Sequence, residues 1–127
     1  MNTKFKFALA VVAGAALGAA AVQGLHAQTK PKAYNVSELE ILDAAANTAY
    51  VPLIQAAQKA AGARNFNTAG GRITAMEGTA PKRVAITEWN SLDEAQAFYK
   101  SKAWTDLAPQ RDKAVKTIRR YAVEAVN

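Results

Sequence analysis

The clearest pattern of hydrophobic and polar positions lies between Lys82 and Tyr99. Residues 83–89 are rich in β-branched and aromatic side chains, which are typical of a half-buried strand. Just beyond this run, Ser91-Leu-Asp-Glu94 matches a capping box, in which the serine hydroxyl accepts a hydrogen bond from the glutamate amide. Apolar residues then recur at helical spacing. This stretch therefore predicts a strand followed directly by a capped helix.

Weaker patterns predict the remaining elements. They are a strand at 33–42, a helix capped by Asp43 that runs to about Ala61 and stops at Gly62, a weak strand at 64–69, a short strand segment at 72–76, a helical stretch from Ser101 to 114, and a last strand at 117–126 packed through Ile118, Tyr121 and Val123. Pro52 either kinks the first helix or starts its regular part, and Pro109 either breaks the later helical stretch or opens another short helix.

The order of these elements predicts the fold class. Strand, helix, strand, strand, helix, strand is the split βαβ pattern, so we expect an α+β, ferredoxin-like domain with both helices on one face of an antiparallel sheet. The other face of such a sheet is uncovered. Because strands this apolar should not face water in a small domain, we expect a homodimer formed through the sheet.

Residues 1–27 have the pattern of a secretory signal peptide. A short segment with Lys4 and Lys6 precedes a small, apolar run, and Leu25-His26-Ala27 offers a cleavage site. The alternative is an uncleaved membrane anchor, because the apolar run is about long enough to span a bilayer. With cleavage after Ala27, residues 28–32 are a linker and residues 33–127 form the domain. The product is then periplasmic or secreted and has no membrane segment.

Charge and composition exclude several classes of function. The formal net charge of +6 falls to +4 when Lys4 and Lys6 are removed with the signal peptide, and no basic stripe interleaves with aromatic residues. Nucleic acid is therefore not expected as a partner. There is no cysteine, and the single histidine is His26, within the signal peptide. The mature chain then lacks Ser-His and Cys-His catalysis, ordinary zinc sites and histidine-ligated haem, and we expect no metal and no cofactor.

The chain also resembles a known family. The residues that carry the resemblance are Ala80-Pro-Lys-Arg-Val84, Glu88-Trp89, Ser91-Leu92, Ala95-Gln-Ala-Phe-Tyr99 and Arg111-Asp-Lys-Ala114, with Tyr50-Val-Pro52, Lys59-Ala-Ala-Gly62 and Ala122-Val-Glu124. Together they are similar to DUF1330, a domain of unknown function, over nearly all of the mature chain. The resemblance implies a dimeric α+β barrel, whose superfamily includes cofactor-free monooxygenases, isomerases, haem-degrading enzymes and binding proteins. One departure is that no arginine precedes Gly70-Gly71, although Arg64 is kept.

Glu88 and Glu38 are the candidate catalytic residues. Alternation places each glutamate on a strand face with apolar neighbours. If both are on the face of the sheet without helices, the two carboxylates enter the interior of the dimeric barrel. Burial beside a like charge would raise the pKa of at least one carboxyl group and make it a general base. The alternative is that each glutamate pairs with an arginine, such as Arg64 or Arg120.

The candidate ligand-binding residues are Arg64, Arg83, Tyr34 and Trp89. A guanidinium group matches a carboxylate in a forked geometry, so the arginines are candidates for binding an anion. The alternative is that they are solvated charges at strand ends. Aromatic residues near Trp89 either line a pocket between helix and sheet or form the core; they are Phe98, Tyr99 and Trp104.

Three function classes follow from these patterns. The first is a binding protein for a small apolar or anionic molecule, and the second is a cofactor-free oxygenase or isomerase that uses Glu88 or Glu38 as its base. The third is a structural partner of an envelope protein. Fold alone does not choose between them.

Overall fold

The computed structural model describes residues 30–126. Its strands are β1 (Ala33–Ile41), β2 (Arg64–Asn65), β3 (Arg83–Trp89) and β4 (Val115–Glu124), and its helices are α2 (Ala44–Ala60), α3 (Leu92–Tyr99), α4 (Lys102–Thr105) and α5 (Ala108–Ala114). The predicted signal peptide and the first two residues of the linker lie outside the described residues.

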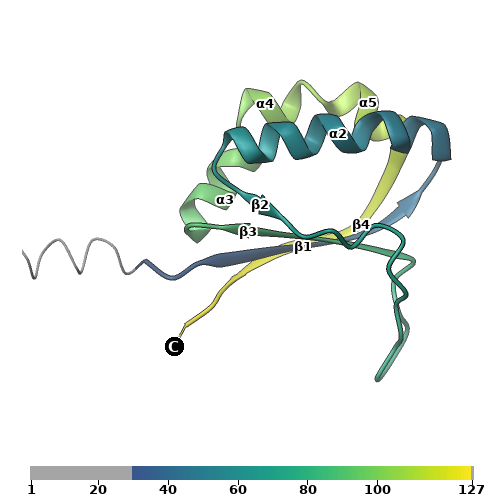
Figure 1. Cartoon of the computed structure of the whole chain (residues 1–127), viewed down its shortest axis with the longest axis horizontal. Helices are drawn as coiled ribbons and strands as arrows, with labels where there is room; N and C mark the ends of the chain where they lie inside the picture. The colour runs from purple at the N-terminus through teal and green to yellow at the C-terminus, as the bar shows by residue number, and fades with distance from the viewer. Residues whose placement is uncertain (1–29, 127) are drawn as a thin grey trace, which may run out of the picture. The chain divides into compact units, whose positions relative to one another are not determined.

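One four-stranded sheet organises the domain, with the strands in the order β2-β3-β1-β4. Each neighbouring pair is antiparallel. The helices all cover the same face of this sheet (Figure 1). The predicted α+β, ferredoxin-like fold is therefore confirmed.

Local capping interactions set the starts of three helices. The Asp43 carboxylate accepts a hydrogen bond from the Ala46 amide at 2.7 Å, and the Ser91 hydroxyl accepts one from the Glu94 amide at 3.1 Å. Ser101 caps α4 in the same way. These contacts satisfy amide groups that have no partner within the helix. The three caps stand where the sequence predicts them.

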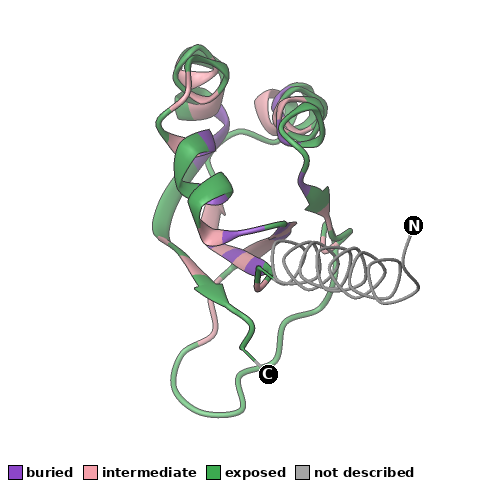
Figure 2. Ribbon diagram, turned by 90° about the vertical axis from the view of Figure 1, so that its left-hand side faces the viewer, coloured by how far each residue is buried: buried purple, intermediate pink, exposed green. Residues whose placement is uncertain are grey.

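The segment between β2 and β3 differs most from the sequence prediction. The predicted strand at 72–76 is not formed, and the predicted strand at 64–69 is reduced to Arg64–Asn65. Residues 66–82 instead form a long loop that extends beyond the helix-free side of the sheet (Figure 1). Gly70 and Gly78 have φ values of +74° and +70°, a conformation that interrupts a strand. The loop is mostly exposed (Figure 2), and its Met76 is 90% exposed.

Both prolines within the predicted helices have clear outcomes. Pro52 lies inside α2, which begins eight positions earlier, so the prediction that regular helix starts at Pro52 is wrong. Pro109 is in the first turn of α5, where its missing amide costs nothing because that amide has no helical partner. The alternative in which Pro109 opens a short helix is therefore confirmed.

The hydrophobic core lies between the sheet and the helices. Trp89 is 1% exposed and packs with Phe98 and three alanines, Ala33, Ala63 and Ala95. The Trp89 and Phe98 ring centroids are 5.2 Å apart. A second cluster joins Tyr50 on α2 to Ala114 and Val115 at the α5–β4 junction. The two clusters leave a less tightly filled region between them, described below.

The face of the sheet without helices is here called the open face. It is mostly apolar, and its two glutamates are both in ion pairs. It carries Tyr34, Val36, Val84, Ile86, Tyr121 and Val123, together with Glu38, Glu88 and Arg119. Tyr121 and Val123 are 51% and 56% exposed, so within the chain these predicted packing residues are not part of the core. Ile118, also exposed, lies where the β1–β4 register shifts between Glu38 and Leu39.

Within residues 30–126, no helix is long and apolar enough to cross a membrane.

Candidate functional site

A cavity of about 120 Å³ lies between the sheet and the helix layer, and is here called the interlayer cavity. Its lining comes from β1, β3 and β4 below, from α2, α3 and α4 above, and from the start of the loop after β2. The lining combines many apolar groups with a few convergent polar ones, which is the usual make-up of a small-molecule site.

The floor of the interlayer cavity is the helix-facing side of the sheet. Ser37 lies at its centre on β1 and is paired in register with Ala85 on β3 and Arg120 on β4. One step along the sheet, Leu39 is opposite Arg83. Side chains on alternate strand positions point to the same face, and these residues therefore all face the helices.

The roof comes mainly from one stripe of α2. Tyr50, Ile54 and Gln58 are spaced four residues apart and line the cavity from above. This spacing aligns side chains on one helix face. Tyr99 at the end of α3 and Trp104 on α4 complete the roof, with ring centroids 4.8 Å apart in an edge-to-face arrangement.

Arg120 is the main charged group of the cavity. Its Nε donates to the Ser37 hydroxyl at 2.9 Å, and its guanidinium carbon lies 4.7 Å from the Trp104 ring centroid and 5.2 Å from that of Tyr99. Burial lowers the pKa of Arg120, and the nearby Tyr99 and Tyr50 oppose that change. In the described part of the chain, Arg120 forms no ion pair with a carboxylate. The cavity therefore contains a positive charge that the protein itself does not neutralise.

The two tyrosines of the roof remain neutral donors. Burial raises the pKa of Tyr50 and of Tyr99, and the adjacent arginines, Arg111 and Arg120, act in the opposite direction. Both hydroxyl groups are therefore protonated at neutral pH. They offer hydrogen bonds to an acceptor and have no tendency to act as bases near pH 7.

Glu38 and Glu88 both lie on the open face, on the opposite side of the sheet from the interlayer cavity. Arg119 binds Glu38 through two hydrogen bonds, at 2.7 Å from Nε and 2.9 Å from Nη2. Glu88 accepts from Lys32 at 2.9 Å and from Arg64 at 3.1 Å. The predicted pairing with Arg64 is therefore found for Glu88, whereas Glu38 pairs with Arg119 and not with Arg120.

These contacts determine the pKa direction of both glutamates. The hydrogen bond from Arg119 holds the pKa of Glu38 below its ordinary value, and the hydrogen bond from Lys32 does the same for Glu88, in each case against the effect of desolvation. The expected rise in pKa is therefore not found. The register also separates the two groups, because Glu88 is opposite Tyr34, four residues from Glu38. That spacing is about 13 Å along a strand, too far for strong mutual repulsion.

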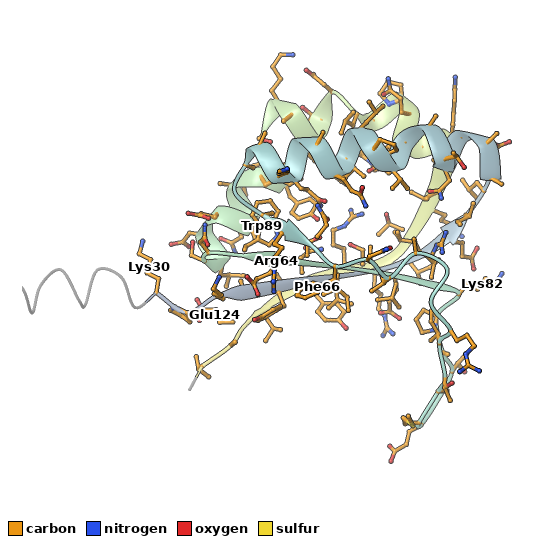
Figure 3. All side chains as sticks on the ribbon, in the orientation of Figure 1. Lys30, Arg64, Phe66, Lys82, Trp89 and Glu124 are labelled. Atoms are coloured by element: carbon orange, nitrogen blue, oxygen red, sulfur yellow. The ribbon has the colours of Figure 1, made fainter. Side chains whose placement is uncertain are left out.

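The four predicted ligand-binding residues do not form one site. Arg83 lines the interlayer cavity, whereas Trp89 is in the core (Figure 3). Tyr34 is on the open face, with its ring centroid 6.4 Å from that of Phe66. Arg64 is at the β2 edge, where it pairs with Glu88 and borders a shallow groove beside Lys59. The core interpretation also holds for Phe98, while Tyr99 and Trp104 line the cavity.

Several cavity residues were not identified from the sequence. The cavity lining includes three buried polar residues, Ser37, Thr87 and Gln58. It also includes one buried aromatic residue, Tyr50. For Ser37 and Thr87, the signal is a polar residue on the buried face of a strand. That signal can be recognised only once the pairing of the strands is known. Within residues 30–126, no group of three or more metal-ligating side chains is found.

The fold and the cavity of the described residues define a ferredoxin-like α+β domain with a small, partly open site of mixed polarity. The chain belongs to the DUF1330 family, a domain of unknown function, whose model matches residues 32–126. A comparison with curated proteins finds no match. Among solved structures, a protein of unknown function from Rhodopseudomonas palustris is similar, with 13% identity, a TM-score of 0.58, and coverage of 84% of this chain and 91% of that chain. At this identity the likeness concerns the fold alone.

Proposed function

We propose that this protein binds a small molecule in the interlayer cavity. The observation that supports the proposal is the cavity itself: about 120 Å³ between sheet and helices, with apolar walls and polar groups from Ser37, Tyr99 and Arg120. An apolar cavity of roughly 150 Å³ holds a benzene-sized molecule. The interlayer cavity is somewhat smaller and is partly open, so the proposed ligand places no more than about one ring inside it.

The catalytic alternative has less support. A general base works best with a pKa near the operating pH. Glu38 and Glu88 have lowered pKa values and are bound to arginine or lysine side chains, which makes each carboxylate a weaker base. Both also lie on the face away from the interlayer cavity. Binding without catalysis by these glutamates is the function that the geometry favours.

The proposal includes a homodimer in an exported compartment. The exposed apolar side chains of the open face, such as Tyr121 and Val123, give a second copy of the chain a surface to pack against. Two sheets packed face to face in this way would form an α+β barrel. Export and cleavage after Ala27 are proposed from the signal-peptide pattern of residues 1–27.

Native mass spectrometry of protein purified from the cell envelope tests these proposals together. We expect a dimer of chains that begin at Gln28, with additional non-covalent mass. A cavity-filling variant, Ala85→Leu, should lose the additional mass because Ala85 lines the cavity. The matched control Ala56→Leu places the same side chain on the exposed side of α2 and should keep it. Retention of the extra mass by Ala85→Leu, or its absence from the wild type, would contradict binding in this cavity.

A further inference from the structure

The residues that line the interlayer cavity are unbalanced in charge. They include two arginines, Arg83 and Arg120, and no aspartate or glutamate. In the part of the chain that the structure describes, neither arginine forms an ion pair. By contrast, Arg64 and Arg119, on other surfaces of the domain, each pair with a glutamate. A positive charge in a partly desolvated cavity is costly unless an anion accompanies it.

Arg120 is also held in a fixed position. Its Nε bonds Ser37 at 2.9 Å, and its Nη2 makes a longer contact with Thr117 at 3.4 Å. The flat guanidinium group lies against the Tyr99 and Trp104 rings. Contacts of this kind restrain the side chain before any ligand arrives and so reduce the entropy lost on binding.

The remaining donors of Arg120 have the geometry of an anion site. Nη1 has no hydrogen-bond acceptor among residues 30–126, and Nη2 has a second N–H group. Together these two nitrogens present the end of the guanidinium fork, which matches the two oxygens of a carboxylate. The hydroxyl of Tyr99, kept protonated by burial, lies in the same cavity, where it interacts with Gln58, Ser37 and Asn35.

The rest of the cavity is suited to a flat apolar body. Ile54, Leu39 and Val115 provide aliphatic surface, whereas the Tyr99 and Trp104 rings are covered by Arg120, and that of Trp104 also by Arg111. The volume of about 120 Å³ leaves room for little more than one ring. We propose that the ligand is a small aromatic or similarly planar carboxylate, with its carboxylate bound by Arg120 and its ring packed between Ile54 of α2 and Leu39 and Val115 of the sheet.

This inference rests on the proposed binding function and specifies its ligand class. A neutral ligand of the same shape would leave the Arg120 fork without an acceptor, which costs binding free energy. A small carboxylate without a ring would leave the apolar walls uncovered. The two requirements can be tested separately with simple probes.

The test uses three probes on the full mature dimer: benzoate, the neutral isostere benzamide, and acetate. We expect benzoate to bind with a dissociation constant of about 1 mM or lower by titration calorimetry. Benzamide and acetate should each bind about 10- to 100-fold more weakly. Two-dimensional NMR should show benzoate-induced shifts at Thr87 and Tyr99 in the cavity, with no comparable shifts at Tyr34 and Val123 on the open face.

Two adjacent arginines provide a matched pair of variants. Arg120→Gln should reduce benzoate affinity to that of benzamide, and Arg120→Lys should restore part of it. Arg119→Gln removes the neighbouring guanidinium from the opposite face of the sheet and should leave benzoate affinity unchanged. Circular dichroism confirms that each variant folds, and the comparison of benzoate with benzamide on the wild type needs no variant at all.

The outcomes separate the two proposals. Equal affinity for benzoate and benzamide, or equal loss in Arg119→Gln and Arg120→Gln, would overturn the carboxylate inference while leaving a small-molecule site. Benzoate-induced shifts confined to the open face would overturn the location of the site. Failure of every probe to bind at concentrations up to about 10 mM would overturn this inference. The proposed binding function would fail as well only if native mass spectrometry of the protein from the cell envelope also detected no bound ligand.

Discussion

Arg119 and Arg120 are consecutive in β4, yet their guanidinium groups serve opposite faces of the sheet. Arg119 binds Glu38 on the open face, and Arg120 binds Ser37 on the face toward the helices. The alternation of side chains along a strand produces this division. One arginine is fully paired within the chain and the other is not, which distinguishes a structural charge from a candidate ligand anchor.

The Glu38–Arg119 pair predicts a specific pH dependence of stability. The pKa of Glu38 is held below its ordinary value of 4.5 in the folded chain. Its contribution is therefore complete above pH 4.5 and is lost as the pH falls through the lower, folded-state pKa. Chemical unfolding of wild type and Glu38→Gln should show a stability difference at pH 7 that disappears under strongly acidic conditions. A difference that grows on acidification would contradict the assignment.

Replacement of Trp89 should affect stability and leave binding intact. Trp89→Ala empties the largest fully buried side-chain site and should lower the free energy of unfolding by about 3–5 kcal/mol. Because Trp89 is in the core and not in the cavity lining, benzoate affinity of the folded fraction should not change. Denaturant titration and calorimetry measure the two quantities. Weaker binding at unchanged stability would instead restore the predicted ligand-binding role of Trp89.

Removal of the cap of α3 should have a smaller, local cost. Ser91→Ala deletes the acceptor for the Glu94 amide and should lower the free energy of unfolding by about 0.5–2 kcal/mol. Ser91→Asp keeps an acceptor at the same place and should recover most of that loss. Equal destabilisation by both variants in thermal or urea unfolding would show that the cap is not the cause.

A charge on the open face should dissociate the proposed dimer. Tyr121→Glu places a carboxylate on the exposed apolar part of the open face, and the same change occurs twice in a two-fold interface. We expect sedimentation velocity to report a folded monomer. The control Leu53→Glu changes an exposed apolar residue on α2 and should remain dimeric. A dimer that persists in Tyr121→Glu would place the interface elsewhere.

Local signals in the sequence predicted local structure well. Ser91 and Asp43 act as helix caps because a cap depends on residues three positions apart. Alternation grouped Glu88 with Val84 and Ile86, and Glu38 with Tyr34 and Val36, but only the register shows that both groups lie on one face of the sheet. The partner of Glu38 could not be obtained in this way, because it depends on the register between β1 and β4, which shifts at Glu38 and Leu39.

The interlayer cavity was harder to predict for the same reason. Its polar residues Ser37, Thr87 and Arg120 come from three strands and meet only after the sheet is assembled. The grouping of Ile118 with Tyr121 and Val123 did not anticipate the register shift, which separates Ile118 from the other two residues on the open face. Whether such a face is buried depends on a second molecule, which no single chain contains.

The short β2 has a consequence for how copies of this protein can meet. Only Arg64 and Asn65 pair with β3 as a strand, and beyond them the Phe66 amide and the Thr68 hydroxyl occupy the Ile86 and Val84 carbonyls. This border thus offers no continuous row of free backbone groups on which a further strand could grow. At the other border, β4 carries Lys116, Arg119 and Glu124, and charged side chains discourage strand addition. Open-ended growth into fibres is therefore disfavoured at both borders. Packing of two copies through the open face would instead stop at a dimer.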